Sequence, residues 1–369
     1  MAVVGPTHPY KGGVAAHTTE LARHLQRAGH ECDLVSWSHM YPSRLYPGEQ
    51  AVPDGVPDLA PYERTTRPLS WARPDTWVRV GRRLRQHDLV VLVHVIPAVA
   101  PAHLMLLRAL GTTARRRPRV VVLAHNVLPH ETHPGAAALV RAMLSRADAT
   151  LVHSAHQGQL AREHGAAQVV VAPLPPHLPG GPVLPREPYD GPPRLLALGM
   201  VRPYKGTDLL LQALGQVPGP TLTIAGELWR SAGVRVQELA DTPALRGRVQ
   251  VRGGYVPASQ IAPLMAAHDV LALPYRSATA SQNALLGFAH GLPVLATRVG
   301  TFPAEITDGV DGLLADPGSV ESLAAALRRL CQPGALGALR AGVRAPDLDA
   351  AWVAYVQALT GLRTRERTG

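Results

Sequence analysis

Short apolar runs alternate with segments of helical periodicity along most of the chain, and this alternation restricts the fold more than any other feature. Such runs predict strands buried on both faces, as in parallel sheets. They occur in both halves, at 89–94, 120–124, 149–153, 195–198, 221–226, 270–273 and 294–297. Because helical segments separate the strands, the pattern predicts an α/β protein with two Rossmann-like domains facing across a cleft.

The length of 369 residues suits two domains rather than one core. A stretch dense in proline and glycine separates the two halves and cannot sustain helix or sheet. We expect an N-terminal domain over 1–180, a linker over 181–193 and a C-terminal domain over 194–345. Residues 40–75 show little periodicity, which predicts an irregular segment that is either disordered or a substrate-facing loop.

The sequence favours a cytoplasmic protein. No apolar run reaches the length of about 18 residues that a membrane span needs. The N-terminus has neither the basic region nor the apolar stretch of a signal peptide. Cys32 and Cys331 are too few and too far apart for a disulfide framework or a zinc knuckle.

A net charge of +10 favours an anionic partner. Nucleic acid is a poor candidate, because only 4% of the residues are aromatic and few bases could stack beside the basic side chains. The apolar segment 100–110 runs into the basic stretch 115–119. This segment is either an ordinary packing helix or a peripheral contact with the inner membrane face.

The stretch from Gly199 to Leu211 follows an apolar strand, passes through a short basic loop and enters a helix. Unpaired amides and the helix dipole make such a place suitable for phosphate. Among 37 basic residues only Lys11 and Lys205 are lysines, and both occur in Tyr-Lys-Gly. Where arginine is the usual base, a lysine suggests a position that needs a compact ammonium. The alternative is an ordinary surface loop.

Two features of the N-terminal half suggest further ligand contacts. The adjacent Gly12 and Gly13 open a helix and let the backbone approach an anion, although a plain tight turn would look the same. His125 ends a predicted strand, where ligands of open α/β sheets gather, although it could be a structural histidine. His130 and His133 follow, but their spacing of three differs from the spacing of four in zinc-protease helices. We therefore predict no metal site.

Several ordered motifs resemble the GT-B glycosyltransferases of family 4, in the subgroup that lacks a pair of glutamates. These are the basic-loop motif Gly-x-x-Arg-Pro-Tyr-Lys-Gly, Asp-Val-x-x-Leu-Pro-Tyr-Arg, Gly-x-Pro-Val-x-Ala-Thr-x-Val-Gly and Asp-Gly-x-x-Gly-Leu-Leu, at 199–206, 269–276, 291–300 and 308–314. The resemblance implies a GT-B fold and retaining transfer of a sugar from a nucleoside diphosphate sugar to a glycan, lipid-linked or small-molecule acceptor. It implies no metal and no cofactor beyond the donor. It also implies that the last segment, 346–369, packs back on the first domain.

The resemblance assigns the donor diphosphate to Arg202 and Lys205, which would neutralise its charge as it leaves. The arginine slot usual in the family holds Met200, so Arg202 would have to replace that arginine. His125 would contact the sugar at the reacting face, as a catalytic residue beside Arg202 and Lys205. The other residues expected to bind the donor are Gly12, Gly13, Tyr255, Val256, Ser281, Gln282, Asn283 and Glu305.

The chain departs from many family members at two positions. Their paired glutamates fall on Ala278 and Leu286 here, which puts a carboxylate near the sugar hydroxyls in doubt. Two other functions remain open: a nucleotide-sugar-binding pseudoenzyme, and an epimerase of similar architecture that converts the donor without an acceptor. The residues do not indicate which base, sugar or acceptor is used.

Overall fold

The computed structural model describes residues 1–40, 42, 51–52, 59–111, 117–128, 135–177, 181–185, 187, 189–278 and 281–362. The chain divides into two compact units. The N-terminal unit comprises Met1–His177 and the chain from Leu348 onward, and the C-terminal unit comprises Leu178–Asp347. The described residues between 172 and 193 form neither helix nor strand.

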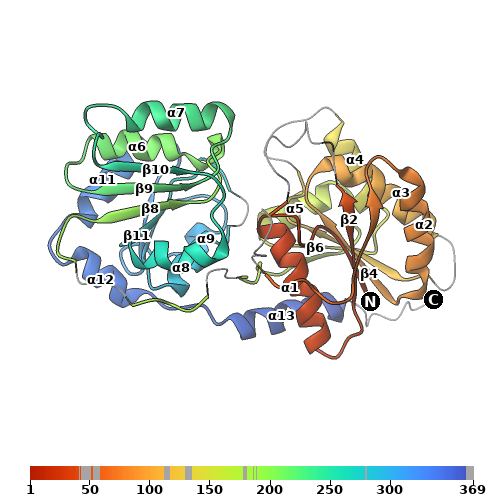
Figure 1. Cartoon of the computed structure of the whole chain (residues 1–369). Coiled ribbons are helices and arrows are strands. Elements are labelled where there is room, and N and C mark those ends of the chain that lie inside the picture. Colours follow the sequence, from red (N-terminus) through yellow and green to blue (C-terminus); the bar gives the residue numbers. More distant parts are fainter. Residues whose placement is uncertain are drawn as a thin grey trace. The chain divides into compact units, whose positions relative to one another are not determined.

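The N-terminal unit is built on a parallel sheet (Figure 1). Its strands within the described ranges are β1 (Ala2–Val4), β2 (Asp33–His39), β3 (Thr65–Ser70), β4 (Leu89–His94), β5 (Arg119–Ala124), β6 (Ala149–Val152) and β7 (Val169–Val171). Their order is β3-β2-β1-β4-β5-β6-β7, so the winding direction reverses between β1 and β4. Ligands of doubly wound sheets bind beyond the carboxyl ends of the strands at such a reversal.

Helices cover both faces of this sheet. They are α1 (Gly13–Arg27), α2 (Pro74–Arg83), α3 (Ala100–Leu110), α4 (Ala136–Leu144), α5 (Ala155–Glu163) and α13 (Leu348–Gly361), with the 3₁₀ turns η2 (Leu84–Gln86) and η3 (Pro97–Val99). Alternate strand residues point to opposite faces. Val90 and Leu92 of β4 pack with α2 to α5, whereas Val91 and Val93 pack with α1 and α13.

The last helix, α13, belongs to the N-terminal unit although it follows the C-terminal unit in sequence. Its Trp352, Tyr355 and Leu359 are buried in the same apolar cluster as Leu21 of α1. The Trp352 indole Nε1 donates a hydrogen bond to the carbonyl of Pro176 at 3.0 Å. The indole therefore ties α13 to the segment that leaves the N-terminal unit.

The C-terminal unit contains a second parallel sheet (Figure 1). Its described strands are β8 (Arg194–Leu198), β9 (Thr221–Gly226), β10 (Val249–Gly253), β11 (Val270–Leu273), β12 (Val294–Thr297) and β13 (Gly312–Ala315), in the order β10-β9-β8-β11-β12-β13. Helices α6 (Thr207–Gly215), α7 (Arg230–Ala240), α11 (Val320–Leu330) and α12 (Ala335–Gly342) pack on one face. Helices α8 (Ala258–Ala266), α9 (Asn283–Ala289) and α10 (Phe302–Glu305) pack on the other. The predicted α/β fold with two Rossmann-like sheets is confirmed.

The prediction of an irregular segment over 40–75 was wrong for its second part, because residues 65–70 form the edge strand β3. Its sequence, Thr-Thr-Arg-Pro-Leu-Ser, lacks an apolar run because only the end of the strand is buried. Pro68 is tolerated because an edge strand has no neighbour on one side that would need the missing amide hydrogen. Most of the first part of this prediction, 41–58, lies outside the described residues.

Candidate functional site

The basic loop of the C-terminal unit connects β8 to α6 at the carboxyl end of the sheet. The chain leaves β8 through Gly199, whose φ is +96°, and forms a 3₁₀ turn, η4 (Pro203–Lys205). Gly206, with φ of +64°, then starts α6 in the left-handed region that favours glycine. The loop therefore turns sharply at both ends, and Lys205 lies between the two turns.

Arg276, which follows β11, holds this loop in place. Its amide donates to the carbonyl of Tyr204 at 2.7 Å, and its guanidinium donates to the carbonyl of Pro203 at 2.8 Å. The same guanidinium forms a two-point ion pair with Asp208 in the first turn of α6, with both distances 2.7 Å. Because one side chain binds both the turn and the helix, the loop has a defined conformation before any ligand arrives.

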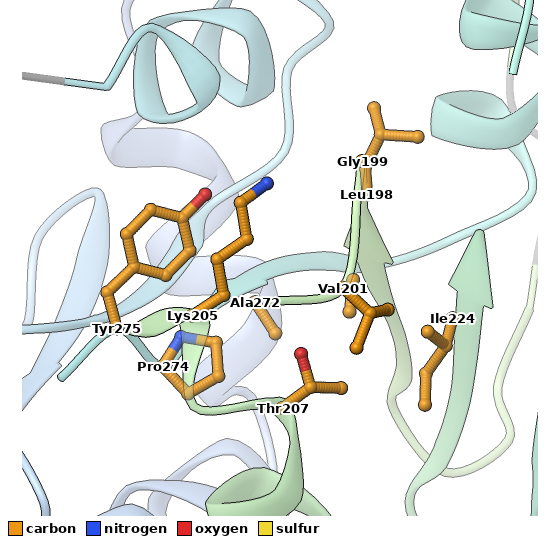
Figure 2. A pocket seen from close by; sticks show the side chains of 10 residues that line it. Leu198, Gly199, Val201, Lys205, Thr207, Ile224, Ala272, Pro274 and Tyr275 are labelled. Atoms are coloured by element: carbon orange, nitrogen blue, oxygen red, sulfur yellow. The ribbon is translucent and has the colours of Figure 1, made fainter. Parts of the chain in front are cut away.

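A small pocket opens beside the loop (Figure 2). It is lined by Ala197, Leu198, Gly199, Val201, Lys205, Thr207, Ile224, Ala272, Pro274 and Tyr275. The Lys205 ammonium lies 5.6 Å from the centroid of the Tyr275 ring, and Figure 2 shows it extending in the same direction as the Tyr275 hydroxyl. A Cβ atom on Gly199 would lie 3.1 Å from Lys205 Nζ. Glycine therefore leaves the ammonium room beside the strand end.

Lys205 carries an uncompensated charge. Burial lowers the pKa of its ammonium, the nearby Arg202 lowers it further, and Tyr204 opposes both. No carboxylate forms an ion pair with Lys205 in the part of the chain that the structure describes. Partial desolvation of a cation that has no counter-ion is unfavourable, so the pocket favours an anion.

Arg202 lies on the same loop, with its guanidinium 4.2 Å from the centroid of the Trp229 ring. Its Nε also lies 3.3 Å from the sulfur of Met200. The structure therefore brings Arg202 and Lys205 to one loop, and the electrostatic effect of Arg202 reaches the ammonium.

The start of α9 is linked to the same pocket through Tyr275. The Asn283 side-chain amide donates to the Tyr275 hydroxyl at 3.2 Å, and the Ser281 hydroxyl accepts from the Asn283 backbone amide at 3.4 Å. Burial raises the pKa of Tyr275, against hydrogen bonds with Ser281 and Asn283. Gln282 precedes the first residue of α9. The predicted residues Ser281 to Asn283 thus lie beside the Lys205 pocket.

Three other residues predicted to bind the donor do not line this pocket, because they follow β10 and β12 rather than β8. Tyr255 and Val256 follow β10, and both are partly buried. Glu305 ends α10, which follows β12, and burial raises the pKa of its carboxyl to about 7 despite a hydrogen bond with Thr301. Its buried Oε2 has no partner within the described residues.

In the N-terminal unit, the predicted residues surround the start of α1 and the end of β5. Gly12, with φ of +100°, precedes α1, and a Cβ on Gly13 would lie 3.6 Å from the His177 ring. The His125 ring lies 5.0 Å, between centroids, from both His17 of α1 and His153 beyond β6. Burial and the neighbouring histidines hold the pKa of His125 well below its usual range. His125 is therefore part of a buried histidine cluster rather than an isolated side chain.

Two family models match the chain, one in each half. "Glycosyltransferase Family 4" matches residues 11–175, and "Glycosyl transferases group 1" matches residues 192–333. The chain belongs to the family 4 glycosyltransferases. The resemblance of its motifs to this family is confirmed.

Individual relatives show how far this similarity extends. A D-inositol 3-phosphate glycosyltransferase of Segniliparus rotundus is 32% identical over 158 residues, which cover 39% of this chain and 35% of that protein. A glycogen synthase of Mycobacterium tuberculosis is 27% identical over 89% of this chain and 85% of its own length. The alignment thus spans about a third of the first relative and most of the second.

Solved structures support the fold. The crystal structure of Anabaena HepE in complex with UDP-glucose superposes with a TM-score of 0.69, at 16% identity, over 98% of this chain and 97% of that one. At this identity the likeness concerns architecture alone. It confirms the predicted GT-B fold of this family 4 glycosyltransferase.

The structure shows the surroundings of Ala278 and Leu286, the two positions to which the resemblance assigns the paired glutamates of many family members. Leu286 of α9 is 4% exposed and packs in the apolar core of the C-terminal unit. Ala278 packs against the same core, and its carbonyl lies 2.9 Å from where a Cβ on Gly300 would be. Neither position supplies a carboxylate to the pocket.

Sequence reasoning missed two groups of residues. His17 and His153 surround His125, and the available signal was that β4, β5 and β6 are each ended or directly followed by a histidine. Trp229 covers Arg202, and no local pattern indicated it.

The described residues can be searched for metal-binding clusters and for membrane-spanning helices. His130 and His133 lie outside the described residues. Within the described ranges, no three His, Cys, Asp or Glu side chains are arranged to hold a metal ion. None of the helices described combines the length and apolar character required to traverse a bilayer.

Proposed function

We propose that this chain transfers a sugar from a nucleoside diphosphate sugar to an acceptor, with retention of anomeric configuration and without a bound metal. The observation that carries the proposal is the ammonium of the half-buried Lys205, which has no ion-pair partner among the described residues and lies at the carboxyl end of a parallel sheet. A diphosphate would supply the missing counter-charge. The family and the UDP-glucose bound by Anabaena HepE support a nucleotide sugar as the source of that diphosphate.

The chemistry needs positive charge where the leaving group forms. As the bond between the sugar and the diphosphate breaks, negative charge develops on the leaving phosphate oxygen. Lys205 lines the pocket and Arg202 lies on the same loop before the reaction, so their charges need little reorganisation. Losing one such group typically costs about 3 kcal/mol of transition-state stabilisation, which is about 10²-fold in rate.

The N-terminal unit is proposed to bind the acceptor, which could be a glycan, a lipid-linked sugar or a small molecule. The roles of Gly12, Gly13 and His125, and those of Tyr255, Val256 and Glu305 toward the donor, rest on the family resemblance and stay predictions. So do the cytoplasmic location, peripheral membrane contact, retention and metal independence.

Calorimetric titration with UDP, GDP and ADP and their common sugars tests the donor site. We expect one nucleotide to bind, and we expect Lys205→Ala to weaken its binding about 10- to 100-fold through the loss of a charge-assisted contact with the diphosphate. The matched control is Arg235→Ala, which removes one positive charge from the exposed face of α7 and should leave binding unchanged.

The outcomes separate the alternatives. If folded wild-type protein binds no nucleotide, the proposed donor site is wrong. Binding without transfer to any acceptor in a glycan and lipid extract would indicate a pseudoenzyme. Conversion of the donor sugar without an acceptor would indicate an epimerase.

A further inference from the structure

The loop after β9 carries an aromatic side chain that none of the predicted roles explains. Trp229 is half-buried, and its ring lies against the guanidinium of Arg202 at 4.2 Å. Aromatic faces attract guanidinium groups electrostatically, and the attraction strengthens when water is excluded. The contact joins a residue assigned to the diphosphate with one that has no assigned role.

The backbone fixes the position of this tryptophan relative to the basic loop. The Val201 amide donates to the carbonyl of Glu227 at 2.8 Å, and the Trp229 amide donates to the carbonyl of Val201 at 3.2 Å. A Cβ on Gly226 would lie 2.3 Å from the carbonyl oxygen of Gly199, so the two strand ends approach as closely as glycine permits. These hydrogen bonds fix the backbone of Trp229 beside the basic loop, so the indole starts from a defined position next to Arg202.

The residue after Trp229 is strained. Arg230 has φ of +44° and is the only non-glycine residue with positive φ among the described residues. Its guanidinium also lies over the Trp229 ring, at 5.5 Å. Non-glycine residues in this region persist where surrounding structure requires them, and they concentrate at functional sites.

The groups that hold Arg202 leave its charge intact. Trp229 and the Met200 sulfur are both neutral, and no carboxylate pairs with Arg202 in the described portion of the chain. An arginine held by an ion pair would offer less charge to a ligand. One held by an aromatic ring and a thioether keeps its charge while its flexible side chain is restricted.

We propose that Trp229 is a positioning residue for Arg202: it holds the guanidinium at the basic loop, ready for the diphosphate of the donor. This arrangement would let Arg202 bind the diphosphate in place of the arginine that the family usually carries at position 200, which is Met200 here. The inference rests on the proposed function, because the ligand it prepares for is the nucleotide diphosphate.

A double-mutant cycle tests the inference, with the affinity for the nucleotide that wild-type protein binds as the readout. We expect Trp229→Leu to weaken binding about 3- to 30-fold and Trp229→Phe to restore most of it, because Phe keeps an aromatic face. In an Arg202→Ala background, Trp229→Leu should have no further effect, because its partner is gone. Trp229→Met serves as a longer, more flexible aromatic-free variant if Trp229→Leu does not fold.

Three results would overturn the inference while leaving the proposed function standing. Equal affinity of wild type and the aromatic-free variants would show that the ring does not position Arg202. An equal loss with and without Arg202 would show that Trp229 acts by another route. Failure of Trp229→Phe to restore binding would exclude the aromatic contact as the cause. If wild-type protein binds no nucleotide, the proposed function fails first and this inference with it.

Discussion

Acidification from pH 7 to pH 5 is expected to unfold the N-terminal unit while the C-terminal unit stays folded. The reason is a group of buried histidines around the ends of β4, β5 and β6. Within the described residues they are His17, His94, His103 and His153, with the half-buried His125 beside them. Burial is the largest cause of the lowered pKa in each, and for His17 the neighbouring charges that lower it further are those of other histidines.

The loss of stability at low pH follows from the number of protons that the folded and unfolded chains bind. Each of these histidines has a folded-state pKa below the value of 6.5 expected in the unfolded chain, so the unfolded chain binds more protons as the pH falls. The stability they contribute is complete above about pH 7.5 and is lost as the pH falls through 6.5 toward the folded-state values. Burial lowers the pKa of His94 to about 4, of His103 to about 3 and of His153 to about 4.

His94, His103 and His153 alone have a large effect on the free energy of unfolding. At pH 5 each favours unfolding by about 2 kcal/mol, which sums to about 6 kcal/mol. His17 and His125 act in the same direction. Domains are stable by about 5–15 kcal/mol, so this loss is enough to unfold one. In the C-terminal unit, burial lowers the pKa of His268, but a hydrogen bond with the carbonyl of Leu264 opposes the shift.

Tryptophan fluorescence of the Trp229→Phe protein measures this transition selectively, because its remaining tryptophans, Trp37, Trp71, Trp77 and Trp352, all belong to the N-terminal unit. His103→Leu should reduce the dependence of stability on pH by about 1.4 kcal/mol per pH unit. The exposed His156 provides the control, and His156→Gln should change nothing. A fluorescence transition that occurs only below about pH 4, where carboxylates titrate, would contradict the prediction.

Gly206→Ala is expected to destabilise the C-terminal unit by about 2–5 kcal/mol and to abolish nucleotide binding. The φ of +64° costs any other residue about 1–2 kcal/mol. A Cβ would also lie 2.0 Å from the carbonyl oxygen of Pro274, which is backbone and cannot rotate away. Relief of this overlap has to move the turn that carries Lys205 away from the end of β11.

Urea unfolding and nucleotide calorimetry of the same variant check both parts of this prediction. Gly334→Ala is the matched control, because Gly334 also has positive φ, at +76°, but a Cβ there would meet nothing within 4 Å. The difference between the two variants isolates the overlap with Pro274 from the backbone strain. Equal stability losses with retained binding in Gly206→Ala would show that the turn tolerates displacement.

The position of Lys205 could be predicted from residues that are its neighbours in sequence. An apolar run, a glycine, a basic turn and a helix start follow one another directly in sequence, so the pattern places Lys205 at the carboxyl end of β8, where the structure has it. Neighbours within a few residues determine such a pattern. Its role toward a diphosphate is a prediction until binding is measured.

Strand β3 and the histidine cluster could not be predicted from sequence neighbours, because both depend on contacts between distant segments. β3 is strand because β2 offers it a hydrogen-bonding edge, and its own residues carry no strand pattern. His17, His125 and His153 lie far apart in the chain and meet because α1 begins, and β5 and β6 end, at the same edge of the sheet. Strand order and helix packing decide which strand ends become neighbours.

The sequence by itself thus determined the α/β class, the two Rossmann-like halves, the family and the position of Lys205, because periodicity, turn chemistry and motif spacing are short-range properties of the chain. Only the tertiary structure decided that Trp229 covers Arg202, that Arg276 anchors the basic turn and that the carbonyl of Pro274 requires glycine at 206. Each of these contacts joins loops from different strands. Such contacts depend on strand order and register, which follow from the burial of the whole sheet rather than from any one segment.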